Sequence, residues 1–163
     1  MFYPFSIVWN SAYKRIYFVW GIVMLFGFSI PLFLHWIPLA LIGLSSQIYH
    51  QKFRTWQAKT LLLLWALVSL GGIFLNARVV IFGLPSPFPI THFAPWWLGF
   101  MAVPQILTGV VLKKYYQVGL GLLWAVAAVL LWEAPIGIQQ TFFLTAALTG
   151  LPYLFIAFSK KTL

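Results

Sequence analysis

Glu133 is the only acidic residue in this sequence, and its isolation limits the chemistry that the chain can perform. The sequence cannot supply paired catalytic carboxylates, a two-aspartate protease site, a carboxylate-rich Mg²⁺ site or an HExxH zinc site. Cysteine is absent, which excludes disulfides, thiolate zinc sites, iron–sulfur clusters and a cysteine nucleophile. Ser86 and His92 remain as a nucleophile and a base, but neither their spacing nor a nearby oxyanion motif supports that role. We therefore expect no enzymatic activity.

The histidines are the remaining residues that could bind a metal or a haem. His35, His50 and His92 are far apart in the sequence, and no acidic cluster or regular histidine spacing accompanies them. Histidines near a membrane surface are ordinarily hydrogen-bonded and hydrated. We therefore expect no metal and no cofactor.

Gln105 is the polar residue best suited to an interior binding site. It lies with Thr108 in an apolar segment, directly after Pro104, which leaves the carbonyl one turn earlier without its backbone partner. Polar side chains in lipid-embedded segments normally point into the helix bundle. The sequence predicts a kinked, interior-facing stretch here, and Pro152 predicts a second kink. A ligand site at these kinks is the alternative to ordinary proline kinks, which are the favoured interpretation.

The overall composition is typical of a protein embedded in lipid. Hydrophobic residues make up 63% of the 163 residues and charged residues 7%, whereas soluble domains are about half apolar and a quarter charged. No stretch between the apolar runs is long enough to fold separately, so we expect residues 1–163 to form a single all-α transmembrane domain. The net charge of +9 comes from basic residues at the ends of apolar runs, which favours lipid headgroups and argues against nucleic acid as a partner.

Six apolar segments approach the length of about 20 residues that crosses a bilayer. The second is the weakest, because it is short and contains several polar residues. We expect the first to remain uncleaved, because it lacks the basic start, short apolar core and cleavage site of a signal peptide. The segments run from Ile16 to Leu34, Trp36 to Gln51, Thr60 to Leu84, Ala94 to Leu112, Tyr115 to Trp132 and Gln140 to Ser159.

The basic residues indicate how these segments are threaded through the membrane. Nine of the ten lie before the first segment, between the second and third, between the fourth and fifth, or after the sixth. Because basic loops face the cytoplasm, the sequence predicts six transmembrane helices in one bundle with both termini cytoplasmic, in a bacterial inner membrane. The opposite loops carry the tryptophans of an interfacial belt, namely Trp36, Trp96, Trp97 and Trp132.

Two stretches next to the apolar segments have more than one interpretation. Residues 85–95 contain four prolines and predict an extended, turn-rich connection, either a stiff linker or a cap over the mouth of the bundle. Residues 1–15 form either a short interfacial helix or a frayed end.

Small residues spaced four apart mark helix faces that can pack closely. Gly121 with Ala125, and Ala146 with Gly150, give such faces in the last two segments. Packing within the chain is the favoured interpretation, and contact with a partner subunit is the alternative.

Arg78 is the one basic residue outside the cytoplasmic set. At about 1.5 Å per residue from Thr60, it lies about 27 Å along its segment, near the outer interface. The favoured interpretation is that its side chain reaches the outer headgroups. Glu133 lies at a similar depth, however, and opposite charges attract strongly where the dielectric constant is low. The alternative is a ligand-binding outer pocket in which Arg78 pairs with Glu133 and the neighbouring polar residues are Asn76, His35 and His92.

Residues 71–114 contain features of a known protein family. The third apolar segment carries the glycine-containing stretch LGGIFLNARVVIFGL, and the fourth begins with FAPWWLGF. In this order of features the chain resembles an uncharacterised family of small six-helix bacterial inner-membrane proteins. The resemblance covers about a quarter of the chain and implies a membrane location without a known activity.

These features favour a membrane-embedded binding or accessory subunit, acting in small-molecule capture for uptake or in a larger membrane complex. Substrate-capture subunits of vitamin uptake systems are similar in size and charge. The alternative is a stand-alone secondary transporter, although ion coupling generally uses acidic residues within the membrane. A lipid-modifying enzyme is a third, weaker hypothesis. The expected partners are the lipid bilayer, a small-molecule ligand and a partner membrane subunit.

Overall fold

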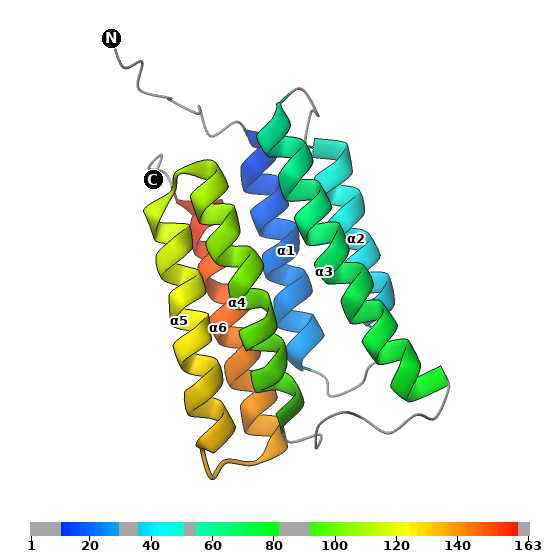
Figure 1. Cartoon of the computed structure of the whole chain (residues 1–163), viewed down its shortest axis with the longest axis vertical. Coiled ribbons are helices and arrows are strands. Elements are labelled where there is room, and N and C mark those ends of the chain that lie inside the picture. The colour runs from blue at the N-terminus through cyan, green and yellow to red at the C-terminus, as the bar shows by residue number, and fades with distance from the viewer. Residues whose placement is uncertain (1–10, 30–35, 51–54, 82–91, 160–163) are drawn as a thin grey trace.

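The computed structural model describes residues 11–29, 36–50, 55–81 and 92–159, and within these ranges all regular secondary structure is helical. Six helices follow one another along the chain and run alternately up and down (Figure 1). They are α1 (Ser11–Ser29), α2 (Trp36–His50), α3 (Trp56–Ile81), α4 (Phe93–Leu112), α5 (Tyr115–Glu133) and α6 (Ile138–Phe158).

Four of these helices are long and apolar enough to cross a membrane. They are α4, α5, α6 and the part of α3 from Trp56 to Phe74. The outer surface of the bundle carries large apolar side chains, among them Leu67 with 60% and Phe155 with 70% of their surface exposed. Such side chains are stable on the outside only where the surrounding medium is apolar, so the helices are those of a membrane-embedded protein.

The first helix takes in residues before its expected start. α1 spans Ser11–Ser29, whereas the apolar segment was expected to start at Ile16; its expected end at Leu34 lies outside the described residues. Lys14 and Arg15 therefore lie within the first turns of the helix, where their long side chains can reach past its end. The expected interfacial helix falls partly on residues 1–10, which lie outside the described residues.

Of the basic residues in the described ranges, all except Arg78, which lies near the other end of α3, are at one end of the bundle. α1, α3 and α5 begin there and α2, α4 and α6 end there, so the start of α1 and the end of α6 lie on the same side (Figure 1). The Nζ atom of Lys14 donates a hydrogen bond of 2.7 Å to the carbonyl oxygen of Ser159, which joins the start of α1 to the end of α6. We call this the basic end, because Lys14, Arg15, Lys59, Lys113 and Lys114 lie at the helix ends that meet there.

Two pairs of helices pack closely because glycines remove side chains from their contacts. At Gly150 of α6, a Cβ atom would meet Leu25 and lie 2.9 Å from the carbonyl oxygen of Gly21 in α1. At Gly121 of α5, it would lie 2.9 Å from the carbonyl oxygen of Ala102 in α4. This confirms the expectation that Gly121 and Gly150 serve packing within the chain.

The hairpin of α2 and α3 packs on the other helices through tryptophan rings laid over glycines. The ring of Trp20 in α1 covers Gly43 of α2, and a Cβ atom at Gly43 would lie 2.8 Å from it. Trp36 of α2 covers Gly27 of α1 in the same way, and Trp97 of α4 covers Gly72 of α3. We call the surface between this hairpin and helices α1 and α4 the tryptophan seam.

Pro152 and Pro95 are accommodated in their helices in different ways. Pro152 cannot donate to the carbonyl of Leu148 one turn earlier, and the indole Nε1 of the fully buried Trp124 donates to that oxygen instead, at 2.9 Å. Pro95 was expected both at the end of the extended connection and within the fourth apolar segment, and it lies in the first turn of α4, which begins at Phe93. A proline in a first turn removes no helical hydrogen bond, so the helix can include it. Residues 82–91, the rest of the expected linker or cap, lie outside the described residues.

Candidate functional site

The interior of the bundle contains a cluster of uncharged polar side chains that come from α1, α4, α5 and α6. Each member has 8% or less of its surface exposed. Gln105 lies seven residues before the end of α4, about 10 Å along the helix axis, so the cluster sits between the bundle centre and the basic end. We call it the polar cluster, and its members are Tyr17, Gln105, Thr108, Gln117 and Tyr153.

A chain of hydrogen bonds joins four of the helices through this cluster. The hydroxyl of Tyr153 in α6 donates to Oε1 of Gln105 at 2.6 Å. The amide nitrogen of Gln105 donates to the amide oxygen of Gln117 in α5. The amide nitrogen of Gln117 donates in turn to the hydroxyl of Tyr17 in α1, at 2.5 Å. Buried amides are stable only when paired in this way, so the chain of bonds fixes how α1, α4, α5 and α6 face each other.

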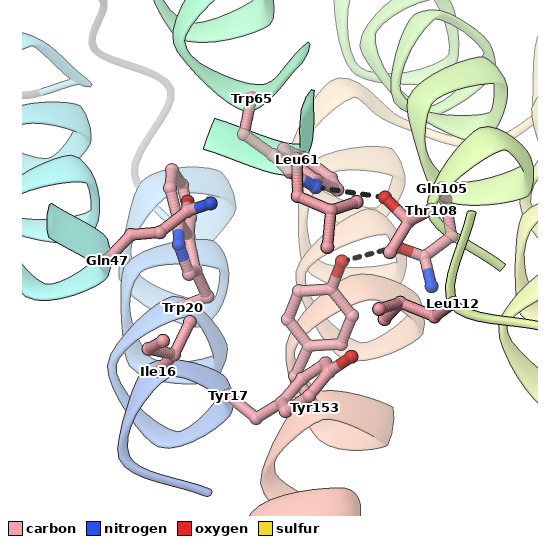
Figure 2. Close-up of a pocket in the computed structure, with 10 residues that line it drawn as sticks. All are labelled: Ile16, Tyr17, Trp20, Gln47, Leu61, Trp65, Gln105, Thr108, Leu112 and Tyr153. Atoms are coloured by element: carbon pink, nitrogen blue, oxygen red, sulfur yellow. Dashed lines mark hydrogen bonds between the residues drawn. The ribbon is translucent and has the colours of Figure 1, made fainter. Parts of the chain in front are cut away.

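A second set of bonds reaches the tryptophan seam. The indole Nε1 of Trp65 in α3 donates to Oγ1 of Thr108 at 3.1 Å, and that hydroxyl donates to the carbonyl of Pro104 at 2.7 Å. Figure 2 shows the bonds from Trp65 to Thr108 and from Tyr153 to Gln105, which reach α4 from the same side in this view. The α2–α3 hairpin is therefore linked to the polar cluster through one polar contact.

A cavity of about 50 Å³ lies between the polar cluster and the hairpin. At about 10–15 Å³ for each water-sized space, it has room for a few small groups. Figure 2 shows the side chain of Gln47 pointing toward it from α2 and Trp20 lying between Gln47 and the cluster. The lining residues are Ile16, Tyr17, Trp20, Gln47, Leu61, Trp65, Gln105, Thr108, Leu112 and Tyr153.

A second cavity, of about 40 Å³, continues along the tryptophan seam toward the opposite end. Trp20 and Trp65 line both cavities, and their ring centroids are 5.8 Å apart. Trp36 and Trp97 close the far side with nearly parallel rings at 6.3 Å. The two cavities therefore adjoin along the tryptophan seam, and the polar cluster lies at one end of it.

Trp97, which lines the second cavity, has a buried indole Nε1 atom that makes no hydrogen bond to any described residue. An unpaired buried N–H group destabilises a protein by about 1–3 kcal/mol, and such groups are rare.

The predicted site residues fall in two places. Gln105 lies in the polar cluster, with none of its surface exposed, which confirms that this stretch faces the interior. Glu133 is exposed at the end of α5, and the ring of His92 lies 4.4 Å from that of the adjacent Trp132. His35 lies outside the described residues, and so do the side chains of Asn76 and Arg78.

The outer pocket of Arg78 and Glu133 stays a prediction, because the side chain of Arg78 lies outside the described residues. The helices place a constraint on it, however, because α3 packs against α2 and α4, whereas α5 packs against α4 and α6. α4 therefore lies between the helices that carry Arg78 and Glu133 (Figure 1).

Sequence reasoning missed most members of the polar cluster. Tyr17 follows Arg15 by two positions and Gln117 follows Lys114 by three, and residues so close to basic pairs look like interfacial residues. Tyr153 directly follows Pro152, and the sequence pattern singled out only the proline, as a kink. The one available signal was the burial cost of Gln117 in an apolar segment, which requires a partner such as Gln105.

The polar cluster offers donors and acceptors but no charge. Tyrosine hydroxyls, glutamine amides and indole N–H groups bind neutral polar groups, and aromatic rings bind flat apolar ones.

Within the described ranges, no three side chains of the metal-ligating types come together. Compared with models of known families, with curated proteins and with solved structures, the chain shows no significant match to any of the three.

Proposed function

We propose that this protein is a multi-pass membrane protein that binds a small, uncharged, flat molecule in the tryptophan seam. It serves either as the capture subunit of an uptake system or as an accessory subunit of a larger membrane complex. The observation that supports this best is the pair of adjoining cavities, which have four tryptophans in their walls and the polar cluster at one end. This combination of apolar walls with a few convergent polar groups is typical of small-molecule sites.

The lining of the seam favours a neutral ligand. Every side chain that lines the two cavities is uncharged, and a buried charge without a partner is costly. A flat ring stacks well against the indoles, and a carbonyl or hydroxyl group on it can bond with Gln47 or Gln105.

The size of the cavities implies that the helices move when the ligand enters. Volumes of about 50 and 40 Å³ are far below the ~300 Å³ at which most ligand sites begin. The α2–α3 hairpin meets α1 and α4 through large rings on glycines, and a shift away from α4 would also break the hydrogen bond from Trp65 to Thr108. We propose that the hairpin shifts away from α1 and α4 to admit the ligand.

Ligand retention tests this proposal. The protein, purified in a mild maltoside detergent, is expected to carry a small molecule that native mass spectrometry detects as a discrete added mass. Gln105→Leu removes a central polar group and is expected to lower the bound fraction at least fivefold. Gln139→Leu makes the same chemical change at an exposed position of α6 and is expected to leave the fraction unchanged. Equal retention by both variants would contradict the seam as the binding site.

The proposal includes six membrane spans with both termini in the cytoplasm of a bacterium. The gathering of Lys14, Lys59 and Lys113 at one end of the bundle supports this threading, because positive residues are retained on the cytoplasmic side. α2 is described from Trp36 to His50, and residues 30–35 and 51–54 on either side lie outside the described residues, so its full length as a span stays a prediction. Membership of the uncharacterised inner-membrane family is part of the same proposal.

Cysteine labelling tests the threading, and the cysteine-free sequence provides a clean background. Ser86→Cys is expected to react with a membrane-impermeant maleimide in cells whose outer barrier has been opened. Lys114→Cys is expected to react only after the inner membrane is disrupted. Labelling of both positions from the same side would show that the threading is wrong.

A further inference from the structure

A groove distinct from the seam lies at the end of the bundle opposite the basic end. It runs between the first turns of α4 and the last turns of α5 and has a volume of about 420 Å³, which is within the ~300–1,000 Å³ range of small-molecule sites. We call it the aromatic groove. Its lining residues are Pro95, Trp96, Gly99, Phe100, Ala128, Val129, Trp132 and Glu133.

Aromatic rings form both walls of this groove. On α4, Trp96 and Phe100 stand one turn apart, with nearly parallel rings whose centroids are 5.2 Å apart. On α5, Trp132 exposes 38% of its surface, and His92 supports its ring from the α4 side at 4.4 Å. The faces of aromatic rings carry partial negative charge, so such walls attract cations.

The groove also contains the only carboxylate of a strongly basic chain. Glu133 is exposed at its rim, and among the described residues no hydrogen bond or ion pair engages its side chain. A carboxylate beside exposed indole rings is the combination that recognises ammonium groups, since the charge and the ring faces act on the same cation. The floor is apolar, because Gly99 has no side chain and a Cβ atom there would lie 3.4 Å from that of Ala128.

We propose that the aromatic groove binds an organic cation that carries a short apolar tail. The ammonium group lies against Glu133, Trp132 and Trp96, and the tail lies along Gly99 and Val129. A quaternary ammonium is favoured over a primary one, because its weaker hydration makes contact with ring faces less costly. The site does not depend on the seam, so either proposal can fail without the other.

Calorimetric titration of the purified full-length protein in neutral maltoside micelles tests this assignment. The probe is hexyltrimethylammonium, with hexanol and hexanesulfonate as neutral and anionic probes of the same chain length. The cation is expected to bind at least tenfold more tightly than either comparator. Glu133→Gln and Trp132→Leu are each expected to weaken its binding about two- to fivefold.

Tyr115→Lys is the matched control for Glu133→Gln. It raises the net charge by the same one unit, but at the basic end, where Tyr115 has 92% of its surface exposed. It is expected to leave cation binding unchanged, and the unfolding midpoints of all variants are expected to match that of the parent. Equal binding of hexyltrimethylammonium and hexanol, or equal affinities of the parent and Glu133→Gln, would overturn the proposal. Binding of hexyltrimethylammonium to Arg78→Gln but not to the parent would also overturn it, because Arg78 would then pair with the carboxylate of Glu133.

Discussion

Gly150→Val is expected to lower the unfolding midpoint of the protein by about 10 °C or more, because it separates two closely packed helices. A Cβ atom at Gly150 would already overlap Leu25 and lie 2.9 Å from the carbonyl oxygen of Gly21. Leu25 can change its rotamer, but the backbone oxygen can move only with α1. Overpacking of this kind destabilises proteins by about 1–3 kcal/mol, and valine adds two further methyl groups. A midpoint shift of 2–4 °C per kcal/mol applies at this chain length.

Gly119→Val provides the control for this change. Gly119 lies in α5, and a Cβ atom there would meet no other atom within 4 Å. Valine has a higher helix propensity than glycine, so this variant is expected to match the parent or to exceed it slightly. Thermal unfolding in detergent, followed by circular dichroism, compares the two variants directly. Similar losses in both would show that α1 and α6 do not pack as described.

Gln105→Leu is expected to destabilise the protein by about 2–4 kcal/mol, because it leaves two buried groups without a partner. The hydroxyl of Tyr153 loses its acceptor and the amide oxygen of Gln117 loses its donor. Each buried group left unpaired costs about 1–3 kcal/mol. Unfolding in mixed micelles of increasing denaturing detergent measures the change.

A double-mutant cycle with Tyr153→Phe separates this bond from general disruption. Tyr153→Phe alone removes the hydroxyl and leaves Oε1 of Gln105 without its 2.6 Å partner. In the double variant neither group remains, so its destabilisation is expected to be smaller than the sum of the single effects by at least about 1 kcal/mol. Additive effects would show that the two side chains act independently.

The all-α class and the positions of the helices along the chain could be predicted from local features. Apolar runs of about membrane length require helices, since only helices or closed barrels satisfy the backbone in lipid. The basic pairs at alternate ends, such as Lys113 and Lys114, correctly indicated which helix ends lie together. The interior position of Gln105 was also predictable, because an amide in an apolar segment must find a partner.

The start of α1 was predicted less well than the bounds of α4 and α5, which lie within one residue of the expected segments. α1 takes in Lys14 and Arg15, whose flexible side chains allow a helix to continue beyond the apolar core. Pro95 was part of both the expected connection and the expected fourth segment, and it lies in the first turn of α4, where proline is tolerated.

The neighbours of each helix were decided only by the tertiary structure. Tyr17 and Gln117 are 100 positions apart, and nothing local to either predicts that their side chains bond. Nothing local predicts the contact of Trp124 either. Its indole, on α5, donates to the carbonyl of Leu148 on α6, which Pro152 cannot reach with a hydrogen bond. Which glycine lies under which tryptophan depends on the crossing of whole helices, as with Gly72 beneath Trp97. Charge and hydropathy act through the bilayer on each segment separately, whereas shape and hydrogen-bond pairing act between segments. Only the assembled bundle therefore contains the tryptophan seam and the aromatic groove.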